Sequence, residues 1–188
     1  MRATEFTYKH KRLDHDEWLR LAKLLEIMVN RGVAGPGALV TASAFHDGNS
    51  MKWSQAQPIK GEALDCVRDV LDQAAIVFNG PKDENGDWFF ITCEGTDEFR
   101  TCQTHEHEYG IYVAAMLLLG MHISPDKWEV PSGVFGGLWL SAQALISNTI
   151  GIDAKIPAHL CRPVKAKRPR KIDLVAEIAR PHWLDYRA

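Results

Sequence analysis

A run of thirteen residues without a charged side chain places the strongest constraint on the fold. Residues 109–121 read YGIYVAAMLLLGM, which is apolar on every side of a helix. Such a helix must be covered by other elements on most of its faces. At about 1.5 Å per residue the run would extend roughly 20 Å, short of the ~30 Å hydrocarbon core of a membrane. We therefore expect a buried helix in a soluble domain.

Histidine and glutamate alternate just before this run, in the sequence THEHE. On a strand, His105 and His107 would share one face and could hold zinc if further ligands came from elsewhere. If Thr104 instead caps a helix, the two histidines lie about 200° apart around its axis. Glu106 and Glu108 would then lie in the first turn, beside the positive end of the helix dipole. We favour the capped helix, and we predict no metal and no cofactor.

Apolar periodicity and turn residues predict the remaining elements. Two amphipathic helices are expected, at residues 14–32 and 60–79, and a further helix with a glycine-rich start is expected at 133–151. Asp14 or Asp16 caps the first of these, and Gly32 ends it. Segments rich in β-forming residues predict strands at 38–45, 51–57, 87–94 and 98–104. The sequence GTD separates the last two strands, which predicts a hairpin.

Length and composition indicate one folded domain. The chain has 188 residues, of which 46% are hydrophobic and 24% charged, as in ordinary globular proteins. We expect an α+β fold over residues 1–154, with an antiparallel or mixed sheet and about four helices. The first residues are polar and carry no apolar secretory segment, so we expect a cytoplasmic protein. The four cysteines then remain thiols, although a pair between Cys93 and Cys102 is geometrically conceivable.

Charge is distributed unevenly along the chain. Residues 1–154 contain 13 lysines and arginines against 21 acidic residues, a net charge of −8. Residues 155–171 contain seven basic residues and no acidic one, a net charge of +7. An acidic body therefore precedes a basic, proline-containing arm at 155–188, with a short helix expected at 172–179.

The arm contains the residues that we expect to bind a partner. A cluster of positive charge can neutralise nucleic-acid phosphates or contact an acidic protein surface. Two aromatic residues near the end of the chain are expected to anchor the terminus. The predicted binding residues are Lys165, Lys167, Arg168, Arg170, Lys171, Trp183 and Tyr186.

A second interpretation starts from a cysteine and a histidine. Asp65-Cys66, the sequence GDWFF at 86–90, and His107 followed by GIYV resemble the NlpC/P60 cysteine peptidases. The resemblance implies a hydrolase in which Cys66 is the nucleophile and His107 its base, with His122 as a possible orienting residue. A thiol activated by an adjacent imidazole is sound chemistry for this reaction class.

Of the two interpretations, the sequence favours the first. We expect a small non-catalytic binding protein that contacts a protein or nucleoprotein partner, with its arm on nucleic acid or an acidic surface and with no membrane contact. The cysteine hydrolase is the alternative.

Overall fold

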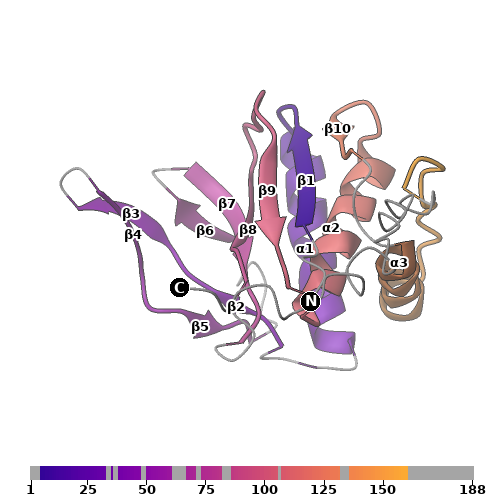
Figure 1. Cartoon of the computed structure of the whole chain (residues 1–188), viewed down its shortest axis with the longest axis horizontal. Helices are drawn as coiled ribbons and strands as arrows, with labels where there is room; N and C mark the ends of the chain where they lie inside the picture. Colours follow the sequence, from indigo (N-terminus) through magenta and orange to yellow (C-terminus); the bar gives the residue numbers. More distant parts are fainter. Residues whose placement is uncertain are drawn as a thin grey trace, which may run out of the picture.

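The computed structural model describes residues 5–32, 35, 38–47, 50–60, 67–70, 73–81, 86–105, 107–131 and 136–160. Over these residues the chain has a mixed α+β fold, as predicted, with its helices gathered at one side of the strands (Figure 1). The described part contains three helices, where about four were expected. Most of the basic arm lies outside it.

The strands form three sheets. A three-stranded sheet has the order β10-β1-β9, a five-stranded sheet has the order β4-β3-β6-β7-β8, and β2 pairs with β5. All pairings are antiparallel except the one between β3 and β6. In chain order the strands are β1 (Glu5–His10), β2 (Val40–Thr41), β3 (Ala44–Asp47), β4 (Ser50–Trp53), β5 (Gln57–Pro58), β6 (Val67–Val70), β7 (Gln73–Phe78), β8 (Phe89–Thr92), β9 (Arg100–Gln103) and β10 (Trp128–Glu129).

Two of the predicted helices are confirmed, each with one of its predicted ends. Helix α1 (His15–Arg31) begins at Asp14, whose carboxylate accepts a hydrogen bond from the Glu17 backbone N–H at 2.9 Å. The Glu17 side chain accepts from the Asp14 N–H in return, which completes a capping box. Helix α3 (Gly136–Ile150) ends at Gly151, whose φ of +78° suits glycine.

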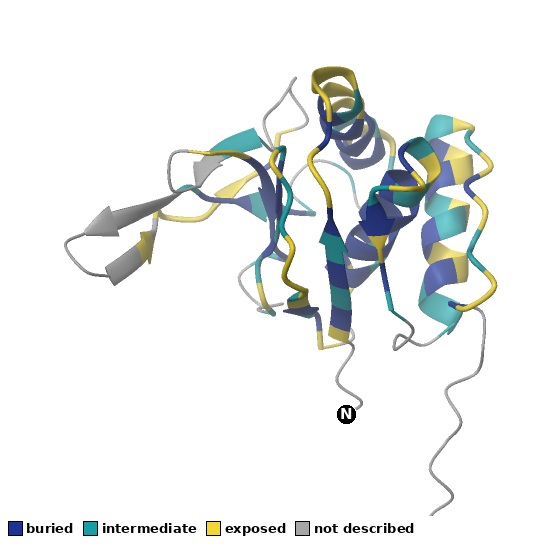
Figure 2. Ribbon diagram, turned by 90° about the horizontal axis from the view of Figure 1, so that it is seen from above, coloured by how far each residue is buried: buried dark blue, intermediate teal, exposed yellow. Residues whose placement is uncertain are grey.

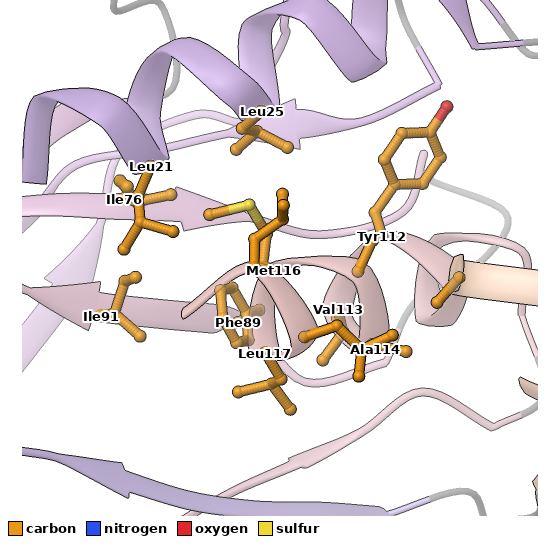
Figure 3. Packing of buried hydrophobic residues seen from close by; sticks show 14 of the residues in the cluster. Leu21, Leu25, Ile76, Phe89, Ile91, Tyr112, Val113, Ala114, Met116 and Leu117 are labelled. Atoms are coloured by element: carbon orange, nitrogen blue, oxygen red, sulfur yellow. The ribbon is translucent and has the colours of Figure 1, made fainter. Parts of the chain in front are cut away.

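The apolar run forms helix α2 (Tyr109–Ile123), and eleven of its fifteen residues are buried. In Figure 3, Met116 of α2 lies among side chains of α1 and of strands β7 and β8, including Leu25, Ile76 and Phe89. The expectation of a helix covered on most faces is therefore confirmed.

The predicted cap of α2 is wrong. The helix begins after Glu108, which makes no side-chain capping bond and does not lie in its first turn. Glu106 lies outside the described residues. Two tight turns separate Thr104 from the helix: the His107 N–H donates to the Thr104 carbonyl, and the Gly110 N–H donates to the His107 carbonyl. Thr104 is instead buried against Gly110, where an added Cβ would lie 2.8 Å from the Thr104 hydroxyl.

The helix predicted at 60–79 is also wrong, because residues 67–70 and 73–78 form strands β6 and β7. The apolar residues of β7 face both ways. Ile76 and Phe78 enter the main core, and Ala75 and Val77 pack with Trp88 and Phe90 on the other face. A strand covered on both faces has a continuous apolar run, and such a run also matches one side of a helix.

The hairpin prediction is correct in its strands and wrong in their pairing. Strand β8 pairs with β7, and β9 pairs with β1, with Phe6 opposite Cys102. The link between them bonds to the end of β1: the Leu13 N–H donates to the Cys93 carbonyl, and the Thr96 N–H donates to the His10 carbonyl. Cys93 and Cys102 do not form a disulfide.

Strand β1 was not predicted. Its side chains alternate, with Phe6, Tyr8 and His10 buried and Glu5 exposed. Phe6 reaches across to Trp139 of α3, with ring centroids 5.7 Å apart, so this strand joins the sheet to the helical layer.

Candidate functional site

The predicted binding residues lie outside the described part of the chain. This applies to Lys165, Lys167, Arg168, Arg170, Lys171, Trp183 and Tyr186, and their roles stay predictions. The structure does describe the segment that leads to them. Residues 151–160 run back along α3 and end beside its first turn (Figure 2).

This leading segment is fixed to the body. Gln143 of α3 donates a hydrogen bond to the Ala154 carbonyl at 3.0 Å, and His159 donates to the Val130 carbonyl at 2.9 Å. Ala154 and Leu160 are buried. The basic arm therefore starts from a defined place on the helical layer.

His107 lies between two aromatic neighbours at the start of α2. Its ring centroid is 6.4 Å from those of His105 and Tyr109. The Tyr109 hydroxyl contacts the carbonyl oxygens of Asp87 and Gln103, at 3.3 and 3.0 Å. These contacts hold the first turn of α2 against β8 and β9, which is a structural role.

Of the two partners proposed for His107, only His122 lies among the described residues. Cys66 lies outside the described residues. The residues directly after it form strand β6, whereas a nucleophilic cysteine is favoured at the start of a helix, which lowers the pKa of its thiol. His122 lies in the last turn of α2, about 20 Å along the helix from its start, so it is out of reach of His107. Gly110 to Val113 belong to α2 and do not form a strand.

Within the described ranges, no three His, Cys, Asp or Glu residues are grouped so that they could hold a metal ion. Cys102 is buried, and burial raises the pKa of its thiol to about 12, so it stays protonated.

A groove of about 400 Å³ opens where the ends of the three helices meet. This volume is within the range of ligand-binding pockets. Apolar side chains from α2 and α3 make up most of its wall, and Arg31 and Glu108 stand at its rim. The lining residues are Arg31, Glu108, Ile111, Tyr112, Ser141, Leu145, Asn148 and Thr149.

Local contacts give the groove a fixed shape. Arg31 Nη1 donates to the Thr149 carbonyl at 3.3 Å, which links the end of α1 to the end of α3. Tyr112 packs against Gly32, where an added Cβ would lie 2.6 Å from the hydroxyl. Its hydroxyl points away from the labelled core residues in Figure 3. Burial and the nearby Glu108 carboxylate raise the pKa of Tyr112, so the phenol remains protonated.

The outer side of α3 continues from this groove and carries no charge. Five of its residues are exposed at helical spacing, namely Leu140, Ser141, Ala144, Ser147 and Asn148, and we call them the α3 face. Leu140 is 61% exposed. None of the fifteen residues of α3 is charged, although 24% of the chain is. The absence of charge over these fifteen residues was visible in the sequence. It is the signal that could have identified the α3 face.

A second cavity, of about 290 Å³, lies at the end of β1 beside β10. Two of its lysines form ion pairs: Lys9 contacts Glu129 at 2.9 Å, and Lys127 binds Glu17 of α1. His10 stacks on Trp128 with ring centroids 4.4 Å apart, and burial lowers the pKa of this histidine. These contacts explain the cavity as part of the packing around β10.

None of the helices among the described residues is long and apolar enough to span a membrane. Comparison with known proteins adds no family assignment, because no family model, no curated protein and no solved structure matches this chain.

Proposed function

We propose that this protein is a small non-catalytic binding protein that acts in the cytoplasm and contacts a macromolecular partner through its basic arm. The observation that carries the proposal is the separation of charge, with −8 over residues 1–154 and +7 over residues 155–171. Seven positive charges within seventeen residues attract a polyanion, either nucleic acid or an acidic protein surface.

The position of the arm supports this function. Lys155 is exposed on the segment that runs along α3. On one side of it the Ala154 carbonyl accepts from Gln143, and on the other side the His159 side chain donates to the Val130 carbonyl. The positive cluster therefore starts from a fixed point on the helical layer. Trp183 and Tyr186 then anchor the terminus through their apolar rings.

The test is the salt dependence of binding to a nonspecific DNA duplex, with poly-glutamate as the acidic alternative. One variant changes five arm residues to glutamine: Lys165, Lys167, Arg168, Arg170 and Lys171. Its matched control changes five exposed body residues to glutamine: Lys11, Arg12, Arg20, Lys52 and Lys60.

We expect the arm variant to bind DNA more weakly at low salt. The slope of log affinity against log salt concentration should decrease by about 4, because five phosphate contacts are lost. The control variant should keep most of the slope. Equal effects of the two variants, or no binding at any ionic strength, would rule out the proposal for DNA. Binding of poly-glutamate alone would indicate an acidic protein partner.

A further inference from the structure

The absence of charge on the α3 face needs a cause, because these residues are exposed on the described body. Charged residues are depleted in the centre of protein interfaces, whereas an ordinary solvated helix alternates polar and charged positions. The face also adjoins the apolar groove, and Ser141 and Asn148 belong to both. The α3 face and the groove therefore form one continuous surface suited to an apolar partner segment.

The chain itself contains a segment of matching character. Residues 172–179 read IDLVAEIA, and as a helix they place Leu174, Val175 and Ile178 on one side. Asp173 and Glu177 lie outside that stripe. A short amphipathic helix that inserts its apolar stripe into a groove is a recurrent mode of recognition.

The described chain ends in a position from which this segment reaches the groove. Residues 151–160 run back along α3 to its first turn in Figure 2, whereas the groove is lined by α3 residues between Ser141 and Thr149. The fifteen residues of α3 extend about 22 Å. The fourteen residues from Leu160 to Leu174 span up to about 45 Å when extended, which is ample.

We propose that the groove and the α3 face dock residues 172–188 of the same chain. Leu174, Val175 and Ile178 fill the groove, and Trp183 covers Leu140. The rim charges complement the segment: Glu108 faces the basic residues that precede it, and Arg31 faces the acidic side chains within it.

The tether favours this occupant over a second copy of the chain. A linker of this length keeps the segment at an effective concentration on the order of millimolar, above that of a separate molecule in dilute solution. The docking would hold residues 161–171 as a loop along the helical layer. It does not depend on which polyanion the basic residues contact.

The first experiment compares methyl NMR spectra of the full-length protein with those of the Ile178→Asp variant. We expect the Ile111 and Leu145 methyl signals to move, because both side chains line the groove. The signals of Ile76 and Ile91, in the core away from the groove, should stay in place. Ile178→Leu is the matched control and should leave all four unchanged. Stationary Ile111 and Leu145 signals in the Ile178→Asp variant would overturn the proposal.

The second experiment uses the unaltered protein, so its result does not depend on whether a variant folds. Carbodiimide joins a carboxylate directly to a lysine in contact with it, and we expect a link between Glu108 and Lys171 or Lys167. Mixing isotopically light and heavy protein distinguishes links within one chain from links between two. Links within one chain support the proposal. Links only between chains would assign the surface to a second copy, and the absence of any such link at Glu108 would contradict the predicted docking.

Discussion

Helices α2 and α3 share one property and differ in another. Neither contains an Asp, Glu, Lys or Arg residue, yet eleven of fifteen residues are buried in α2 and only four of fifteen in α3. The core explains the absence of charge in α2. The described body leaves it unexplained in α3, where the proposed docking of residues 172–188 would account for it. The same sequence signal therefore has two causes, and only the structure distinguishes them.

The largest expected effect comes from a matched pair of leucine truncations. Leu117 of α2 is completely buried, so Leu117→Ala should lower the free energy of unfolding by about 2–5 kcal/mol. Leu140→Ala on α3 should cost much less, because this side chain is largely exposed on the body. Urea denaturation of both variants measures the difference. Equal losses would break the contrast between the two helices.

A pair of glycine substitutions extends the contrast to backbone packing. A Cβ at Gly120 of α2 would lie 2.4 Å from the Trp128 ring, so Gly120→Ala should destabilise the protein by about 1–3 kcal/mol. A Cβ at Gly136 of α3 would meet nothing within 4 Å. Gly136→Ala should therefore be neutral or slightly stabilising. Thermal unfolding measures the change in stability of each variant. A destabilised Gly136→Ala variant would mean that α3 is more tightly packed than the described contacts show.

Helix α1 provides the counter-example, because several of its charged residues have assigned partners. Asp14→Ala removes the carboxylate that accepts from the Glu17 N–H, and should cost about 1 kcal/mol. Asp16, which is exposed in the first turn, is the control, and Asp16→Ala should cost less. Chemical denaturation of both variants tests the assignment, which fails if Asp16 proves the more important residue.

The last contrast is a dependence on pH. Hydrogen bonding to Lys127, with Ser124 and the Asp14 N–H, lowers the pKa of Glu17 from 4.5 to about 2 despite its partial burial. A lowered pKa contributes stability above pH 4.5, and this stability is lost as the pH falls toward 2. The advantage of the native protein over Glu17→Gln should therefore shrink across that interval. Unfolding curves at several pH values measure the difference in unfolding free energy between the two proteins. A difference that stays constant with pH would contradict the assigned contacts of Glu17.

The parts of the fold that local chemistry determines were predictable from the sequence. Asp14 and Gly151 mark the ends of α1 and α3 through capping and a left-handed backbone, and the apolar run of α2 required burial. Residues 67–78 were not predictable in the same way. Val67, Val70 and Phe78 match a helical period, but the sheet neighbours of β7 decide the outcome.

The groove could not be predicted at all, because it is a tertiary feature. Arg31, Tyr112 and Leu145 are far apart in the sequence and meet only because three helix ends converge. Strand β1 was only partly predictable. Its alternation of Phe6, Tyr8 and His10 was present in the sequence, but it is short and lies within a polar stretch.

The most direct test of the account is whether solvent reaches the α3 face in the complete protein. Hydroxyl-radical footprinting compares Leu140, 61% exposed on the described body, with Leu19 of α1, which is 37% exposed. If residues 172–188 cover the α3 face, Leu140 should be modified more slowly than Leu19, and Ile178→Asp should reverse that order. If Leu140 is modified faster than Leu19 in the unaltered protein, the face is open to solvent and the account is wrong.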